Sequence, residues 1–177
     1  VSPGGFGSST SVVLLAGNVK NRSSLALMPT HCIANRICCF EFGKNWVTFL
    51  SKLTDQRIRI AEDSLCEMLD IGELSGKRFL DIGCGSGLSS LAAKNKGAKV
   101  TSFDYDESSV WCTTELKRKY YPDSDAWDVY QGSALDRDFL SSLGKHDIVY
   151  SWGVLHHTGD LKKGLNEYSR VLKKGGS

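Results

Sequence analysis

The chain has 177 residues, of which 41% are hydrophobic and 24% are charged, a composition typical of one soluble globular domain. A net charge of +2 is too small to indicate nucleic acid or a membrane surface as a partner. No apolar run approaches the roughly 20 residues that a membrane-spanning helix needs.

The cysteines do not indicate a metal site. None of the six forms a C-x-x-C pair, and the group of His31, Cys32, Cys38 and Cys39 has none of the usual zinc-ligand spacings. We therefore expect no metal, and we interpret the cysteines as free thiols in a reducing cytoplasm.

The first 40 residues differ from the rest of the chain. They contain no acidic residue, are rich in Ser and Gly, and have no sustained helical or strand period. We expect residues 1–40 to be a poorly ordered leader, or sequence outside the fold, and we assign residues 41–177 to one domain.

Helix and strand patterns alternate through this domain. The predicted elements, in chain order, are a helix at 58–69, a strand at 77–83, a helix at 86–97, a strand at 98–104, a helix at 106–122, strands at 127–132 and 146–152, and a helix at 160–176. This order predicts an α/β fold with a Rossmann-like parallel sheet and helices on both faces. Such sheets bind ligands at the carboxyl ends of their strands.

The segment "FLDIGCGSGLSS" has glycines at alternate positions directly after the first predicted strand. A phosphate loop needs Gly-Lys-Ser/Thr at its end, but Leu88 follows Gly87 here. The dinucleotide fingerprint needs its third glycine three residues after the second, whereas these glycines are spaced by two. We expect Asp81 to point toward the ligand, where an acid suits a positive charge better than a pyrophosphate.

The pattern Asp81-x-Gly83-x-Gly85-x-Gly87 resembles motif I of the class I S-adenosylmethionine-dependent methyltransferases. The resemblance implies S-adenosylmethionine as the cofactor. It assigns Asp81, Gly83, Cys84, Gly85 and Gly87 to cofactor binding, with the glycines around the methionine end. A tight strand-to-helix turn without any ligand is the alternative.

The second predicted strand ends in another acid, Asp104, which follows Gly83 by 21 positions. By the resemblance, Asp104 binds the ribose hydroxyls and Tyr105 lies against the adenine. An acid after a strand is also a common helix cap, and Asp106 is the other candidate for that cap.

After the third predicted strand, relatives often carry Gly-Asp-Ala, and this chain has Gly132, Ser133 and Ala134. We expect Ser133 and Ala134 to contact the adenine, although a serine replaces the acid. Asp136 is a possible cap for the segment that follows. Ser151 ends the fourth strand, and the resemblance puts it beside the sulfonium.

The segment "WGVLHHT" at 152–158 is similar to the small-molecule branch of the family, which includes ubiquinone-pathway O-methyltransferases. His156 and His157 are candidates for a general base, but a structural role is the more common one for a loop histidine. We assign no catalytic residue. Phe42, Trp46 and Phe49 either form an aromatic lid over the cofactor, as in relatives, or pack in the core.

The class I sheet has seven strands, whereas this chain supplies four before "VLKKGGS", so the fold is apparently truncated after the fourth strand. We favour a fragment of a longer protein, and we expect the fourth strand to have an exposed hydrophobic edge.

The function implied is methyl transfer from S-adenosylmethionine to a small-molecule acceptor, with neither nucleic acid nor a membrane as partner. An NAD-dependent oxidoreductase and a non-catalytic S-adenosylmethionine-binding module are the alternatives. The oligomeric state stays open.

Overall fold

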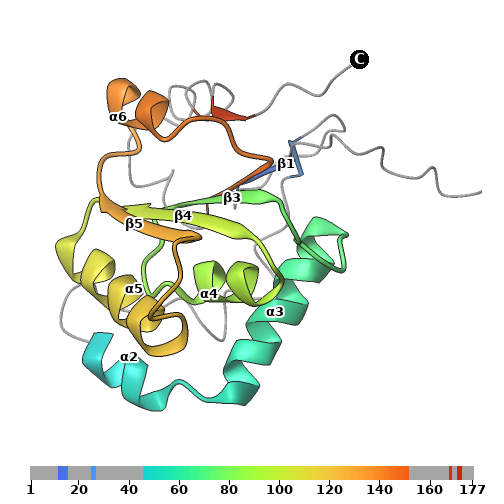
Figure 1. The fold of residues 1–177 in the computed structure, drawn as a ribbon, viewed down its shortest axis with the longest axis vertical. Helices are drawn as coiled ribbons and strands as arrows, with labels where there is room; N and C mark the ends of the chain where they lie inside the picture. Colours follow the sequence, from blue (N-terminus) through green and yellow to red (C-terminus); the bar gives the residue numbers. More distant parts are fainter. Residues whose placement is uncertain (1–11, 16–24, 27–45, 152–167, 169–170, 173–177) are drawn as a thin grey trace, which may run out of the picture.

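The computed structural model describes residues 12–15, 25–26, 46–151, 168 and 171–172 (Figure 1). The strands are β1 (Val12–Leu15), β2 (Leu25–Ala26), β3 (Arg78–Ile82), β4 (Lys99–Asp104), β5 (Trp127–Gln131) and β6 (Ile148–Ser151). The helices are α2 (Trp46–Lys52), α3 (Asp55–Leu69), α4 (Leu88–Asn95), α5 (Glu107–Tyr120) and α6 (Arg137–Ser142). The strands form one sheet in the order β2-β1-β6-β3-β4-β5, and every neighbouring pair is parallel.

Helices cover both faces of this sheet, which confirms the predicted fold class. Helices α2 to α5 lie on one face and α6 lies on the other (Figure 1). Strand β3 is buried on both faces. Its successive side chains point to opposite sides of the sheet, and helices cover both sides. Phe79 packs in the core under α3 to α5, whereas Leu80 and Ile82 pack in the second core, under α6.

Helices α3, α5 and α6 begin at side chains that accept hydrogen bonds from free backbone N–H groups. Thr54 caps α3, and Asp106 caps α5 by accepting from the N–H of Ser109 at 2.9 Å. Asp136 caps α6 by accepting from the N–H groups of Asp138 and Phe139. The structure thus confirms the capping roles that the sequence offered for Asp106 and Asp136.

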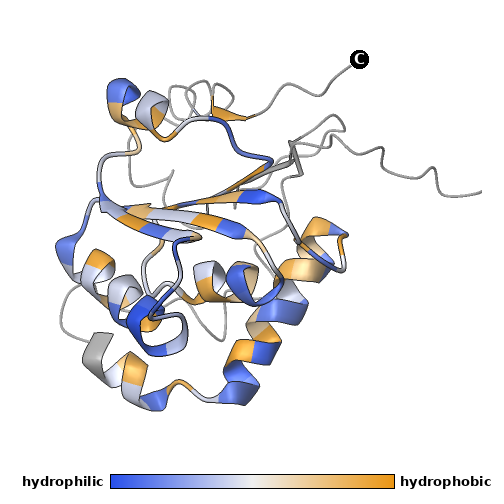
Figure 2. Ribbon diagram, viewed as in Figure 1, coloured by the Kyte–Doolittle hydropathy of each residue, from blue (hydrophilic) through white to orange (hydrophobic). Residues whose placement is uncertain are grey.

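Figure 2 shows hydrophobic and hydrophilic residues alternating along α3, as expected for a helix with one face on the core. Ile58, Leu65 and Leu69 are its buried side chains. Within the described ranges, no helix combines the length and the apolar character needed to cross a membrane.

The N-terminal segment departs from its expected lack of structure, because two strands form within it. Strand β1 pairs with β6 over its whole length, in the register Val12 to Ile148 through Leu15 to Ser151. The expectation of an exposed edge on the fourth strand is therefore wrong, since β1 covers that edge. The domain boundary at residue 41 stays a prediction.

Two further differences concern helices. Helix α6 is absent from the predicted elements because six residues are too few to give a clear helical period. Helix α4 begins at Leu88, after Gly87, and not at the expected serine. Most of the predicted helix at 160–176 lies outside the described residues.

Candidate functional site

The glycine-rich turn joins β3 to α4 at the carboxyl edge of the sheet. Gly83, Gly85 and Gly87 have φ angles of 74°, 52° and 76°, in the left-handed region that side chains disfavour. Three such residues in five positions fold the chain back sharply, so that α4 starts directly beside the end of β3. The alternating glycines are therefore required by the shape of this turn.

Most N–H groups of the turn are hydrogen-bonded within the protein. Those of Gly83 and Cys84 both donate to the carbonyl of Phe103, at 2.8 and 3.0 Å. That of Gly87 donates to the Cys84 carbonyl at 2.8 Å, and that of Gly85 donates to Asp104. A phosphate-binding turn directs such N–H groups at its anion. This turn has used four of them internally, which argues against a pyrophosphate ligand.

Asp104, the last residue of β4, holds the turn from the side. Its Oδ2 accepts from the N–H of Gly85 at 2.9 Å, and its Oδ1 accepts from the N–H of Asp106 at 3.0 Å. Partial burial raises the pKa of this carboxyl, and the hydrogen bonds from Asp106 and Gly85 oppose that rise. Each oxygen keeps acceptor capacity, because a carboxylate oxygen has more than one lone pair.

Asp81 lies differently from its prediction, which had the side chain pointing toward the ligand. Only 1% of the residue is exposed. It shares the strand face of Phe79, two positions earlier, and therefore points toward the helix layer. Its Oδ2 accepts from the hydroxyl of Ser90, on the first turn of α4, at 2.5 Å. Burial raises the pKa of Asp81 to about 7, an effect that the Ser90 bonds partly offset.

The hydrogen bond to Asp81 belongs to a longer buried chain that the sequence did not reveal. The hydroxyls of Ser90 and Ser102 are 2.7 Å apart, and the indole Nε1 of Trp127 donates to Ser102 at 3.0 Å. All three residues are fully buried. Ser102 and Phe103 are successive buried residues of β4, so they point to opposite faces of the sheet. A polar residue at a buried strand position was the one sequence signal that could have indicated this hydrogen-bond chain.

Cys84 and Gly87 have structural roles in the turn. The Cys84 thiol is buried and accepts a hydrogen bond from the Thr113 hydroxyl of α5 at 3.3 Å. A Cβ on Gly87 would lie 2.7 Å from Thr113 Oγ1 and 2.9 Å from its Cα. Glycine at this position therefore allows α5 to approach the start of α4. Cofactor contacts from these two residues stay a prediction.

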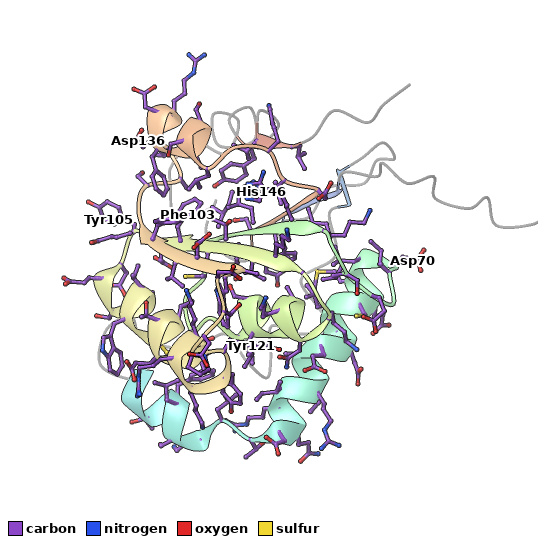
Figure 3. The ribbon with its side chains drawn as sticks, viewed as in Figure 1. Asp70, Phe103, Tyr105, Tyr121, Asp136 and His146 are labelled. Atoms are coloured by element: carbon purple, nitrogen blue, oxygen red, sulfur yellow. The ribbon has the colours of Figure 1, made fainter. Side chains whose placement is uncertain are left out.

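The residues predicted around the adenine surround the ends of β4 and β5. Tyr105 is 79% exposed, and Figure 3 shows it pointing away from the sheet. The Ser133 hydroxyl accepts from the N–H of Leu135 at 3.1 Å, so it stabilises its own turn. Ala134 is buried in the core under α6. The structure brings these residues to one edge of the sheet but does not test their contacts.

Ser151 ends β6 next to Ile82 of β3, one residue before the glycine turn. Its hydroxyl and that of Tyr168 are buried, and neither has a hydrogen-bond partner among the described residues. Burial raises the pKa of the Tyr168 phenol.

Several predicted residues lie outside the described part of the chain. The candidate bases His156 and His157 are among them, as are Phe42 and the cysteine group at 32–39. Phe49 of the possible lid packs in the core between α2 and the rest of the helix layer. The structure therefore supports core packing for this one aromatic residue.

A groove of about 400 Å³ lies in the helix layer, between the first half of α3 and the last residues of α4 and α5. It is lined by Asp55, Ile58, Arg59, Glu62, Asn95 and Tyr120. None of these residues belongs to the glycine turn, and neither Asp81 nor Asp104 is among them.

Comparison with protein families gives a match to the model described as "Methyltransferase domain" over residues 80–177. The ubiquinone biosynthesis O-methyltransferase of Bordetella avium is 30% identical over 105 residues, which are 59% of this chain and 42% of that protein. The demethylmenaquinone methyltransferase of Clavibacter sepedonicus is 31% identical over 129 residues, covering 73% of this chain and 48% of that protein. The chain thus spans less than half the length of these relatives.

Among solved structures, a putative S-adenosylmethionine-dependent methyltransferase from Methanococcus maripaludis matches with a TM-score of 0.59. The match covers 75% of this chain and 58% of that one, at 19% identity. Magnesium protoporphyrin IX methyltransferase from Synechocystis PCC 6803, solved with bound S-adenosylhomocysteine, matches with a TM-score of 0.55 over 66% and 52% of the two chains, at 19% identity. At this level of identity, the likeness establishes a common fold.

Proposed function

Because the chain belongs to the methyltransferase-domain family, we propose that it binds S-adenosylmethionine at the glycine turn and serves methyl transfer to a small molecule. The cofactor would supply an electrophilic methyl group, whose bond to sulfur breaks as an acceptor atom attacks the carbon. The described residues would bind and orient the cofactor and keep water away from the reacting atoms.

The observation that carries this proposal is the charge around the turn. Asp81 and Asp104 are close enough that the charge of Asp104 raises the pKa of Asp81. Among the described residues, no lysine or arginine forms an ion pair with either acid. Two partly or fully buried carboxylates without a counter-charge favour a cationic ligand. S-adenosylmethionine carries a sulfonium and an ammonium group.

The other predicted residues fit the same ligand. Asp104 retains lone pairs for the two hydroxyls of a ribose, while its bonds to the turn fix its orientation. Gly83 and Gly85 have no side chain to keep a ligand from the backbone. Tyr105, exposed at the end of β4, offers a ring on which an adenine can stack.

For the methyl acceptor we propose only a chemical class, and for the cellular location only a compartment. Two relatives are named ubiquinone biosynthesis O-methyltransferase and demethylmenaquinone methyltransferase, which supports a small organic acceptor for this chain. We propose a reducing cytoplasm because the described cysteines, Cys66, Cys84 and Cys112, are all free thiols. A base would be needed only for an acceptor that arrives protonated, and His156 and His157 are the candidates.

An NAD-dependent oxidoreductase is disfavoured by the turn itself. A dinucleotide site directs backbone N–H groups at a pyrophosphate, whereas the N–H groups of Gly83, Gly85 and Gly87 are already bonded within the protein. An uncompensated carboxylate near that position would also repel the phosphate charge.

The test is a thermal unfolding experiment on the chain alone, with S-adenosylhomocysteine, and with NAD. A ligand at about 100 times its Kd stabilises the folded state by roughly 2.7 kcal/mol, which moves the Tm clearly. We expect a rise in Tm with S-adenosylhomocysteine and none with NAD. A cooperative transition that responds to NAD alone would replace the proposal with the oxidoreductase.

A further inference from the structure

We propose that Ser90, Ser102 and Trp127 form a directed hydrogen-bond chain that positions Asp81 and sets the pH range over which the glycine turn binds its cationic ligand. This inference rests on the proposed function, because it concerns the strength of cofactor binding. It assigns a role to three buried residues that lie outside the glycine turn.

The direction of the chain follows from its two ends. An indole N–H can only donate, so Trp127 donates to the Ser102 oxygen. At the other end, Ser90 donates its single hydroxyl proton to Asp81. The proton between the two serines must therefore come from Ser102, which donates to Ser90 over 2.7 Å. Each group from Trp127 onward thus directs a positive hydrogen toward the Asp81 carboxylate.

The arrangement suits the control of a buried charge. Chained hydrogen bonds polarise one another, so Ser102 and Trp127 strengthen the donation that Ser90 makes to Asp81. The bond also joins the first turn of α4 to the penultimate residue of β3 and closes the base of the glycine turn. The chain can therefore act on both the charge and the shape of the site.

The groups that face Asp81 contain no cation among the described residues. Asp104 lies at the end of β4, and the buried thiol of Cys84 lies in the turn, where the charge of Asp81 raises its pKa. On the neighbouring strand, Tyr150 is the register partner of Asp81, and its hydroxyl accepts from Ser89 at 3.4 Å. Burial raises the pKa of Asp81 to about 7, so its charge changes within the range accessible to experiment.

A cationic ligand favours the ionised form of Asp81, so binding should release a proton at pH values below about 7. The affinity for S-adenosylmethionine should then rise with pH, by at most about tenfold per pH unit, and level off above neutrality. S-adenosylhomocysteine lacks the sulfonium charge, so its affinity should rise less steeply.

The experiment is calorimetric titration with S-adenosylmethionine and S-adenosylhomocysteine between pH 5.5 and 8.5, in two buffers that differ in ionisation enthalpy. Ser90→Ala and Ser102→Ala remove donors from the chain, and Trp127→Phe removes the indole N–H while keeping an aromatic ring. Ser89→Ala is the matched control, because Ser89 lies on the same helical turn but its hydroxyl bonds Tyr150. Circular dichroism at each pH checks that the variants are folded.

We expect Ser90→Ala to move the midpoint of the pH dependence upward by about one unit, and Ser102→Ala and Trp127→Phe to move it less. Asp81→Asn should remove the proton release and the steeper response to S-adenosylmethionine. An equal loss of affinity at every pH, with an unchanged midpoint, would mean that the chain is only structural and would overturn the inference. A folded wild-type chain that binds neither ligand at any pH would overturn the proposed function as well.

Discussion

The carboxylate of Asp104 accepts a hydrogen bond from the N–H of Gly85 at 2.9 Å, which links the end of β4 to the middle of the glycine turn. The acid expected to bind a ribose therefore also holds the turn that precedes it in sequence. Binding and local structure depend on the same side chain, and a substitution there affects both.

We predict that Asp104→Ala abolishes the Tm rise caused by S-adenosylhomocysteine and lowers stability by about 1.5–3 kcal/mol, because the N–H groups of Gly85 and Asp106 lose a charged acceptor. Thermal and urea unfolding measure the two effects. Asp106→Ala is the control: it removes the α5 cap, costs about 1 kcal/mol, and should leave ligand binding intact. Full binding by Asp104→Ala would contradict the assigned role.

We predict that Gly87→Ala destabilises the protein by more than Gly76→Ala, by at least about 1 kcal/mol. Both glycines have positive φ, at 76° and 72°, so both variants carry the same backbone strain. Only at Gly87 would the new Cβ also meet backbone, 2.9 Å from Thr113 Cα, whereas at Gly76 it meets nothing within 4 Å. Urea unfolding of the two variants measures the difference, and equal losses would refute the close approach of α5.

We predict that Asp81→Asn changes the pH dependence of stability. The pKa of Asp81 is raised by burial from 3.8 to about 7, so the folded state holds its proton over a range in which the unfolded state has lost it. This contribution to stability is complete below about pH 4 and is lost as pH rises to about 7. The stability of Asp81→Asn relative to wild type should therefore increase between pH 4 and pH 8, by at most about 4 kcal/mol.

Urea unfolding of both proteins at several pH values tests this sign. An Asp81→Asn advantage that shrinks as pH rises would mean that the folded site stabilises the carboxylate. In that case the hydrogen bonds from Ser90 would outweigh the cost of burial.

We predict that Gly132→Ala disturbs the packing of α6, because the added Cβ would overlap the ring of Phe139. That ring packs edge-on against Phe103, with centroids 5.1 Å apart. The expected loss is about 1–3 kcal/mol, as for other overpacked cores, and near-ultraviolet circular dichroism should change with it. Gly132→Ala combined with Phe139→Leu should recover part of the stability, and no recovery would locate the strain elsewhere.

The central elements were predictable because each has a strong period and a clear end. Strand β3 ends directly before Gly83, β4 ends at Asp104, and α5 ends two residues before Pro122. Short or non-local elements were not predictable in this way. Helix α6 is shorter than two turns, so its sequence shows no clear helical period. Strand β1 depends on its pairing with β6, and the local sequence around residues 12–15 gives no sign of that distant partner.

The site was predictable in position but not in orientation. Motif spacing located Asp104 and the glycines at the carboxyl edge of the sheet. The direction of Asp81 was missed, although the period of two in β3 gives it the same face as Phe79 and thus points it toward α4. The partners Ser102 and Trp127 come from two other strands, so only the folded sheet brings them to Asp81.

The pairing of β1 with β6 has a consequence for the order of folding. The two strands come from distant parts of the sequence, so their contact closes a very long loop and carries a large entropic cost. The units β3-α4-β4 and β4-α5-β5 need far shorter loops and should assemble first. During synthesis, the residues of β1 leave the ribosome before β6 exists, and they can join the sheet only after residues 16–151 have been made.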